Sequence, residues 1–406
     1  MKPTTRRPAA LATALGASIA LLAGASQSAS AGGGATAAAT ATAPAPRRVI
    51  VKTSKIAPGL IFKKYVDEKL PRRTFVLVAD LAEPLTLDVT LGANALPARA
   101  ATSDMAKRAG ALAAINGDFT DPHVGRPVHP YEQDGQFLQT VDQLGSVFAV
   151  SADEQRVTLG KPAVSVTATD TTDGRVWTLD RWNEGFPAPG EIGGYSPIGG
   201  SLEAPPDHAC SVRLLPASPL ALSPSSDGGM DQGFTVGVAA CREASMTRNG
   251  GVVLSAPPAT DEATELLSLS PGTPIELHWT MGWPGVLDAV GGTPVLVQDG
   301  QIAVSPTCST SLCRANPRTG IGVRANGKIL LVVVDGRRKG WSLGPTLYGF
   351  AKIMRDLGAV QALNLDGGGS TTMVVKGEVV NKPSDGFERH ISNAVVVLPG
   401  PDPGES

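Results

Sequence analysis

The chain is organised around residues 361–373, which read QALNLDGGGSTTM. The apolar start of this stretch is typical of a buried strand, and it leads to the carboxylate of Asp366. Gly367, Gly368 and Gly369 follow, and three glycines in a row are costly because each loses much backbone entropy on folding. They are expected where the backbone takes a positive φ or lies against a bulky group, and successive N–H groups in such a turn form a concave anion site. A flexible surface loop is the alternative.

Residues 109–118 repeat this pattern earlier in the chain. Their sequence, AGALAAINGD, aligns without gaps with LGAVQALNLD at 357–366, and each follows a helical pattern. A helix, a glycine stop, an apolar strand and an Asn-x-Asp strand end therefore occur twice. Carboxylates at strand ends fill a core poorly, so we expect Asp118 and Asp366 to line one cleft. Chance similarity of two helix–strand units is the alternative.

The remaining pattern predicts an α+β fold, with a mixed β-sheet core and a few packed helices. Helices are predicted over 102–109, capped by Thr102 or Ser103, and over 347–357, capped by Thr346 or Ser342. Alternating apolar residues and Asp-Gly or Asn-Gly turns indicate strands and hairpins. These cover residues 48–51, 73–79, 85–91, 111–115, 146–150, 295–304, 321–334, 359–365, 371–380 and 393–398.

Two long segments interrupt this core. Residues 119–143 are rich in Pro, Gly, His and Asp and are predicted to form a long loop over the cleft. His123 and His129 in this loop could act as general acids, and solvated surface groups are the alternative. Residues 151–285 alternate short β-type runs with polar loops, which predicts a mostly β insertion with tryptophans in its core.

The N-terminus predicts export. Lys2, Arg6 and Arg7 precede an apolar run over about 9–25, and a small-x-small site follows, which is typical of a secretory signal peptide over 1–31. A Gly/Ala/Thr/Pro tether over 32–46 is expected to be a disordered linker. No later segment has about 18 unbroken apolar residues, so we expect no membrane span.

Composition limits the function. The 406 residues carry a formal net charge of −2 and no basic stripe, which argues against a nucleic-acid partner. Aromatic residues make up 4%, which argues against a long carbohydrate-stacking platform.

Four cysteines in an exported chain suggest two disulfides. Cys308 and Cys313 are close enough to close a tight loop, which would leave Cys210 with Cys241. Two other pairings are open from the sequence alone. A zinc site would need tighter pairs and a reducing compartment.

The polar residues at strand ends suggest hydrolytic chemistry. Asp335 ends a third apolar strand, and Asn-Pro at 316–317 presents Arg318 at a rigid position. Arg318 and Arg389 could each bind a phosphate or carboxylate, or pair with a structural acid. Two carboxylates flanking a bond are what glycoside cleavage needs. Several carboxylates could also hold a divalent cation, Ca²⁺ or Mg²⁺. No GxSxG, HExxH or Walker motif is present in the sequence.

These residues occur in the order seen in the phosphodiester glycosidase family, which the chain resembles. The resemblance covers most of 73–150 and 288–398. It rests on NGDF at 116–119, NPRTGIG at 316–322, VDGR at 334–337, LNLDGGGSTTM at 363–373 and ER at 388–389.

The resemblance implies a catalytic domain over 47–400 and a specific pocket. Asp118 and Asp366 would be the acid/base or nucleophile pair, and Asp335 would orient an arginine or bind a cation. Arg318 and the amides of 367–370 would hold a phosphate. The expected substrate-binding residues are Asn116, Arg318, Gly367, Gly368, Gly369, Ser370 and Arg389.

The predicted function is that of a secreted hydrolase cleaving a sugar-1-phosphodiester in cell-wall or capsular glycopolymers. Two alternatives are open. One is a glycosidase acting on a neutral or uronic-acid polysaccharide, with the arginines binding a carboxylate. The other is a non-catalytic protein that binds such polymers at a surface.

Overall fold

The computed structural model describes residues 48–67, 69–141, 145–151, 153, 157–199, 209–217, 223–241 and 251–400. The predicted signal peptide and linker lie outside these residues. Strands predominate in the described part, which also holds three α-helices, α1 (Thr102–Arg108), α2 (Asp261–Leu267) and α3 (Leu347–Asp356). The prediction of an α+β fold holds in this coarse form.

The segment before Asp366 is a central strand of an eight-stranded sheet. This strand, β24, pairs with β22 on one side and with β20 on the other, both antiparallel. The strand order is β1 (Arg48–Ala57), β2 (Leu60–Asp67), β3 (Arg73–Ala79), β23 (Ile329–Val334), β22 (Arg318–Arg324), β24 (Ala359–Asn364), β20 (Val295–Gln298), β21 (Gln301–Ile302).

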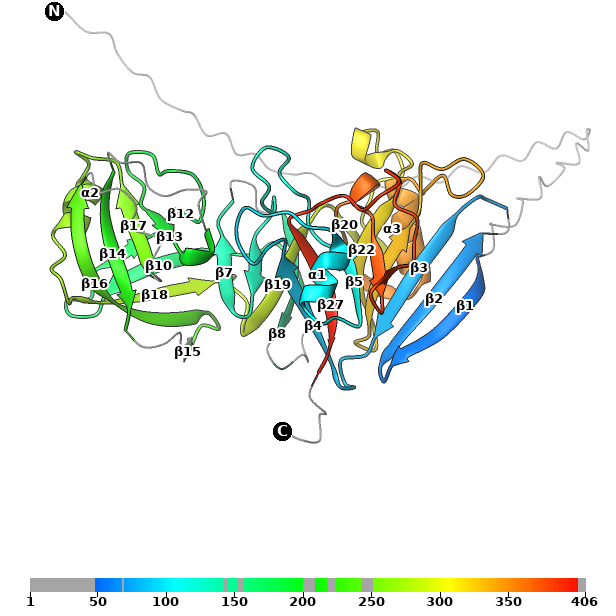
Figure 1. Ribbon diagram of the computed structural model, residues 1–406, viewed down its shortest axis with the longest axis horizontal. Coiled ribbons are helices and arrows are strands. Elements are labelled where there is room, and N and C mark those ends of the chain that lie inside the picture. Colours follow the sequence, from blue (N-terminus) through cyan, green and yellow to red (C-terminus); the bar gives the residue numbers. More distant parts are fainter. Residues whose placement is uncertain are drawn as a thin grey trace, which may run out of the picture. The chain divides into compact units, whose positions relative to one another are not determined.

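The earlier repeat lies in a different sheet. Strand β5, which leads to Asp118, pairs antiparallel with β25 and β27. The five-stranded order is β26 (Glu378–Val379), β25 (Met373–Val375), β5 (Ala113–Asn116), β27 (Asn393–Pro399), β4 (Leu85–Leu91). Figure 1 shows β4 and β27 side by side although they come from opposite ends of the described chain.

A third sheet also has five strands, all paired antiparallel. Its order is β7 (Gln136–Gln139), β6 (Tyr131–Gln133), β19 (Val286–Gly292), β8 (Ser146–Ser151), β9 (Val157–Gly160). These three sheets are joined by one core, which takes buried side chains from each of them.

The alternation of side chains along each strand builds the layers. In β3, Phe75 and Leu77 enter the core shared by the sheets, whereas Val76 and Val78 enter a second core on the opposite face. Because successive side chains point to opposite faces of a sheet, a strand that is apolar on both faces must be covered on both.

Two helices provide this cover. Leu347, Phe350 and Met354 of α3 share the second core with the outer face of the eight-stranded sheet. Ala106 of α1 packs with Ala114 and other residues on the outer face of the sheet that contains β5. Each Asn-x-Asp strand end thus follows a helix that covers its own sheet.

The predicted insertion contributes a nine-stranded sheet with a core of its own. Trp177, Trp182 and Trp279 are buried in this core, as expected, together with residues of α2, whereas Trp283 is only partly buried against it. The sheet order is β11 (Val176–Thr178), β10 (Ser165–Asp170), β18 (Pro274–Thr280), β16 (Met230–Cys241), β14 (Cys210–Pro216), β17 (Val252–Ala256), β13 (Gly193–Tyr195), β12 (Arg181–Trp182), with β15 (Ser223–Pro224) beside β16. The division of the chain into domains stays a prediction.

The predicted mixed β-sheet core is found in part. The strand pairs in the three sheets of the main core are antiparallel, and the parallel pair β12–β13 lies in the nine-stranded sheet. Antiparallel neighbours can be joined by short turns, whereas parallel ones need long crossovers. The Asp299-Gly300 and Asn326-Gly327 turns supply such short connections, as predicted.

Two local predictions were wrong. The long loop over 119–143 contains the hairpin β6–β7, because Tyr131, Phe137 and Leu138 bury their side chains in the cores. Helix α1 has no side-chain cap from Thr102 or Ser103. The Ser103 N–H instead donates to the Glu388 carboxylate at 3.0 Å.

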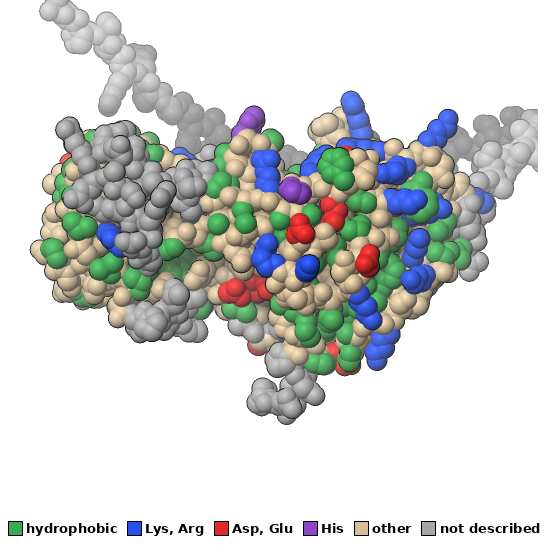
Figure 2. Space-filling view, in the orientation of Figure 1, with side chains coloured by type: hydrophobic (Ala, Val, Ile, Leu, Met, Phe, Trp, Pro, Cys, Tyr) green, Lys and Arg blue, Asp and Glu red, His purple; other side chains and the backbone are tan. Residues whose placement is uncertain are grey.

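Both disulfides pair as the spacing suggested, Cys210 with Cys241 and Cys308 with Cys313. None of the described helices combines the length and the apolar character that a membrane-spanning helix requires. On the face drawn in Figure 2, Lys and Arg side chains are spread over the region of β1, β2 and β3 among apolar and neutral ones.

Candidate active site

The two Asn-x-Asp strand ends meet. The Asp366 N–H donates to the Gly117 carbonyl at 3.1 Å. The Asn116 side-chain amide donates to the Asp366 carbonyl at 2.7 Å, across 250 positions of sequence. The repeated segments therefore form one continuous structure, although their strands belong to different sheets.

Asn116 holds this junction together. Its Oδ1 accepts hydrogen bonds from the Thr319 hydroxyl at 2.7 Å and from the Thr372 N–H at 3.0 Å. The side chain is fully buried. These contacts connect the end of β5 to β22 and to the residues after the glycines, so Asn116 positions the backbone around a neighbouring hollow without lining it.

A hollow of about 340 Å³ lies beside the triple glycine. Six of the predicted site residues line it, and Asn116, Asp118, Asp335 and Ser370 do not. Its lining residues are Phe119, Ser311, Leu312, Asn316, Arg318, Arg337, Asp366, Gly367, Gly368, Gly369 and Arg389.

The three glycines allow close approach of the backbone to its neighbours. Gly368 has a φ of +62°, which L side chains rarely adopt. A Cβ on Gly369 would lie 2.0 Å from Nη2 of Arg389. A Cβ on Gly367 would lie 2.8 Å from the Pro317 carbonyl oxygen. Gly368, Gly369 and Ser370 form a 3₁₀ turn, and Gly367 lies between this turn and Asp366.

Asp366 is the carboxylate that faces the hollow. Burial raises its pKa to about 6, and the charge of Asp118 adds to this increase. The Ser370 hydroxyl, the Gly367 N–H and the charge of Arg389 act in the opposite direction. A carboxyl group with a pKa near 6 can both hold and release a proton close to neutral pH.

Asp118 lies behind the hollow and is fully buried. Its Oδ1 is 2.6 Å from Nδ1 of His129 and also accepts from the Phe119 N–H at 2.6 Å. Its Oδ2 accepts from the His129 N–H at 2.8 Å. Both oxygens of the Asp118 carboxylate therefore have hydrogen-bond partners within the protein. His129 is itself buried, so the solvated alternative for this histidine was wrong, whereas His123 is exposed.

Asp335 is also fully buried and bonded. Its Oδ2 accepts from the Trp341 indole N–H at 2.7 Å. Its Oδ1 accepts from the Asn381 side chain at 3.1 Å and from the Lys382 N–H at 3.0 Å. Burial raises the pKa of Asp335. These bonds anchor the segment after β26 to the end of β23.

Two arginines project into the hollow without an acidic partner among the described residues. Nη2 of Arg318 donates to the carbonyl oxygens of Leu312 at 2.5 Å and Arg314 at 2.6 Å. Burial lowers the pKa of Arg318 to about 10, and the charge of Arg337 acts in the same direction. Nε of Arg337 donates to the Asn316 side chain at 3.0 Å.

Arg337 was not among the predicted site residues. Its φ of +58° is unusual for a residue with a side chain, and it follows directly on Asp335-Gly336 at the end of β23. The VDGR motif at 334–337 was the available signal. Arg389 differs from the other two arginines because its Nη2 pairs with Asp385 at 2.6 Å.

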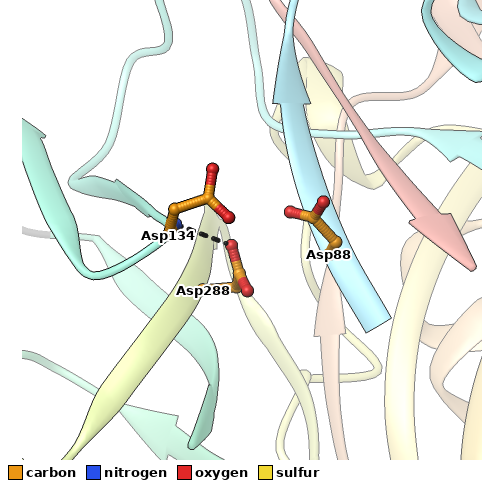
Figure 3. A group of neighbouring side chains, drawn as sticks. All are labelled: Asp88, Asp134 and Asp288. Atoms are coloured by element: carbon orange, nitrogen blue, oxygen red, sulfur yellow. Dashed lines mark hydrogen bonds between the residues drawn. The ribbon is translucent and has the colours of Figure 1, made fainter. Parts of the chain in front are cut away.

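A separate acidic cluster could hold a cation. Oxygens of Asp88, Asp134 and Asp288 lie within 4.8 Å of one another, and the Asp134 N–H donates to Asp288 at 3.2 Å (Figure 3). Burial raises the pKa of Asp288 well above its usual value, and the charge of Asp88 adds to this. These residues come from β4, the β6–β7 turn and β19, and none of them lines the hollow.

A larger cavity of about 480 Å³ lies beside the nine-stranded sheet. The described side chains that line it, Trp182 and Trp279 among them, include no acid, base or cation. The indole N–H groups of these tryptophans are bonded to the carbonyl oxygens of Phe137 and Gly135. Of these two cavities, the smaller hollow is the one whose lining includes a carboxyl group, that of Asp366.

Comparison with known proteins agrees with the sequence motifs. Residues 227–398 match the family model described as phosphodiester glycosidase. The resemblance to the phosphodiester glycosidase family is thereby confirmed. The match to this glycosidase family includes the expected segment 288–398 and begins earlier, in the nine-stranded sheet, whereas residues 73–150 lie outside it.

Curated relatives match shorter segments. The SPbeta prophage-derived uncharacterized protein YomE of Bacillus subtilis is 37% identical over 82 residues, which are 20% of this chain and 13% of that protein. N-acetylglucosamine-1-phosphodiester alpha-N-acetylglucosaminidase of Mus musculus is 38% identical over 68 residues, 17% of this chain and 13% of that protein. The chain thus covers about an eighth of the length of each.

The fold also occurs in a solved structure. A hypothetical protein from Synechocystis aligns with 87% of this chain and 64% of its own, with a TM-score of 0.64 and 19% sequence identity. At this identity the likeness concerns the fold alone.

Proposed function

We propose that the chain is an exported hydrolase that cleaves the bond between a sugar and the phosphate of a sugar-1-phosphodiester. Cell-wall or capsular glycopolymers are the proposed source of this substrate. The observation that carries the proposal is the composition of the hollow. Two arginines without acidic partners, in the part of the chain that the structure describes, lie with a glycine turn beside Asp366.

The arginines fit a phosphodiester better than a neutral sugar. A guanidinium in a desolvated hollow gains most from an anion, because its planar fork can bind two oxygens at once. Arg318 is 2% exposed, and its Nε has no hydrogen-bond partner within the described residues. A phosphate oxygen would satisfy this buried donor.

Asp366 supplies the proton in the proposed reaction. It protonates the oxygen that bridges C1 of the sugar and phosphorus, while water adds to C1 and the C1–O bond breaks. The products are the free sugar and a phosphomonoester, and the proton lost by the water restores Asp366. Arg318 and Arg337 stabilise the charge on the departing phosphate.

The remaining predicted residues act on this arrangement indirectly. Asp118 places a negative charge near Asp366, which favours the protonated form of that acid. Asn116 and Asp335 position the backbone through their buried hydrogen bonds. A requirement for Ca²⁺ or Mg²⁺ stays a prediction.

The substrate class is tested with Arg318→Ala. Turnover of a sugar-1-phosphodiester should fall at least a hundredfold, while turnover of a neutral aryl glycoside of the same sugar should change less than threefold. Steady-state kinetics on both substrates make the comparison, and circular dichroism checks the fold. Equal losses on the two substrates would show that the arginine has no phosphate-specific role.

A further inference from the structure

A small disulfide-closed loop forms one wall of the hollow. Cys308 and Cys313 are joined over a sequence separation of 5. The 3₁₀ turn Ser311–Cys313 lies inside this loop, and Ser311 and Leu312 line the hollow. The Thr310 hydroxyl contacts Sγ of Cys313 at 3.0 Å, which links the disulfide to the start of the turn.

The same loop holds the Arg318 side chain. Nη2 of Arg318 donates to the carbonyl oxygen of Leu312, inside the loop, and to that of Arg314, the residue directly after it. The strand β22 fixes the backbone of Arg318, but its long side chain has many rotamers. The two carbonyl oxygens select one of them, and they can do so only if the loop keeps its shape.

Because the partners of Arg318 are carbonyl oxygens, the positive charge of its guanidinium is not neutralised. A carboxylate partner would neutralise the guanidinium, whereas carbonyl groups orient it and leave its full positive charge for a ligand. Arg389, which pairs with Asp385, shows the alternative arrangement in the same hollow.

We infer that the Cys308–Cys313 loop is a positioning element that orients Arg318 toward the phosphate of the substrate. This inference rests on the proposed function, because it assigns phosphate binding to Arg318. It gives the disulfide a role in ligand affinity that is separate from any effect on global stability. The loop acts through Arg318 and does not itself touch the reacting atoms.

The test compares two disulfide deletions. Cys308→Ser/Cys313→Ser removes the loop closure, and Cys210→Ser/Cys241→Ser removes the pair between β14 and β16 as a matched control. Binding of inorganic phosphate is measured by titration calorimetry, and KM and kcat are measured for a sugar-1-phosphodiester. We expect the phosphate Kd and KM to rise about tenfold in the first variant and less than twofold in the control.

A double-mutant comparison separates positioning from a general loss of structure. In an Arg318→Ala background, opening the loop should change the phosphate Kd less than twofold, because the group it orients is gone. A tenfold further loss in that background, or equal losses in both disulfide variants, would overturn the inference.

A second variant keeps the test valid if the disulfide deletion fails to fold. Ser309→Gly/Thr310→Gly leaves the disulfide in place but loosens the exposed part of the loop. Phosphate Kd should rise at least threefold, and an unchanged Kd would contradict the inference. If the unaltered protein binds phosphate but does not turn over the phosphodiester, the proposed reaction fails while the positioning role stands.

Discussion

At the residue scale, the chemistry depends on one carboxyl group that is kept partly protonated. Asp366 has a pKa of about 6 against a usual value of 3.8, and burial is the main cause. The folded state therefore binds more protons at this group than the unfolded chain does between about pH 4 and pH 6. By linkage, this group's contribution to the free energy of unfolding falls as the pH rises through that window.

Asp366→Asn should therefore separate activity from stability. Turnover should fall at least a thousandfold, because the asparagine amide cannot act as an acid or a base near neutral pH. At pH 8 the free energy of unfolding should rise by about 1–2 kcal/mol, since a buried charge is removed. Urea denaturation at pH 4 and pH 8 measures this. A variant that is less stable than the unaltered protein at pH 8 would contradict the origin given for the pKa shift.

The glycines are a second residue-scale requirement. In Gly369→Ala, the added Cβ would meet Nη2 of Arg389 at 2.0 Å and Oδ2 of Asp385 at 2.2 Å. Both atoms end flexible side chains, so we expect the fold to survive while KM for the phosphodiester rises about tenfold. Gly185→Ala is the control, because a Cβ there meets nothing within 4 Å. Unchanged kinetics in Gly369→Ala would show that Arg389 need not stay in place.

At the element scale, the N-terminus of α1 is capped by Glu388, a residue far away in the sequence. The Glu388 carboxylate accepts from the Ser103 N–H at 3.0 Å and from the Ser103 hydroxyl at 2.5 Å. A carboxylate at a helix N-terminus accepts a hydrogen bond from a backbone N–H that would otherwise be unpaired. Its negative charge also interacts favourably with the positive end of the helix dipole. Glu388 also lies next to Arg389 of the hollow, so this contact connects α1 to the site.

Glu388→Ala should cost about 0.5–2 kcal/mol of stability, the usual range for losing a helix cap. Thermal denaturation measures the loss. Thr346→Ala is the matched control, because Thr346 caps α3 through the Gly349 N–H at 3.1 Å. We expect Glu388→Ala to raise KM for the phosphodiester as well and Thr346→Ala to leave it unchanged. A KM that rises in Thr346→Ala but not in Glu388→Ala would show that the contact between Glu388 and α1 does not affect the site.

Sequence patterns predicted elements well where the periodicity is local. The helix over 347–357 has its apolar face and its Thr346 cap as expected. The cap of α1 was missed because Glu388 lies 285 positions away from Ser103. The hairpin β6–β7 was missed because short strands rich in polar residues resemble loops until their few apolar side chains find a core.

At the scale of the whole molecule, the sequence could suggest that two distant segments come together, but it could not establish how their side chains are placed. The repeat at 109–118 and 357–366 predicted that Asp118 and Asp366 line one cleft. Direct hydrogen bonds do join the two strand ends, but Asp366 lines the hollow whereas Asp118 is fully buried and does not. The sequence did not reveal that the Asp118 carboxylate would have His129 as a hydrogen-bond partner, nor that the Asp335 carboxylate would have Trp341 as one. Such partners depend on how the sheets stack, which no local pattern encodes.

The most direct test of the account is to determine which bond of the substrate is cleaved, the C1–O bond or the P–O bond. We expect hydrolysis of a sugar-1-phosphodiester in ¹⁸O-labelled water to place the label on C1 of the released sugar, as measured by mass spectrometry of both products. Label in the phosphomonoester would show cleavage of the P–O bond and would contradict a glycosidase reaction at this hollow.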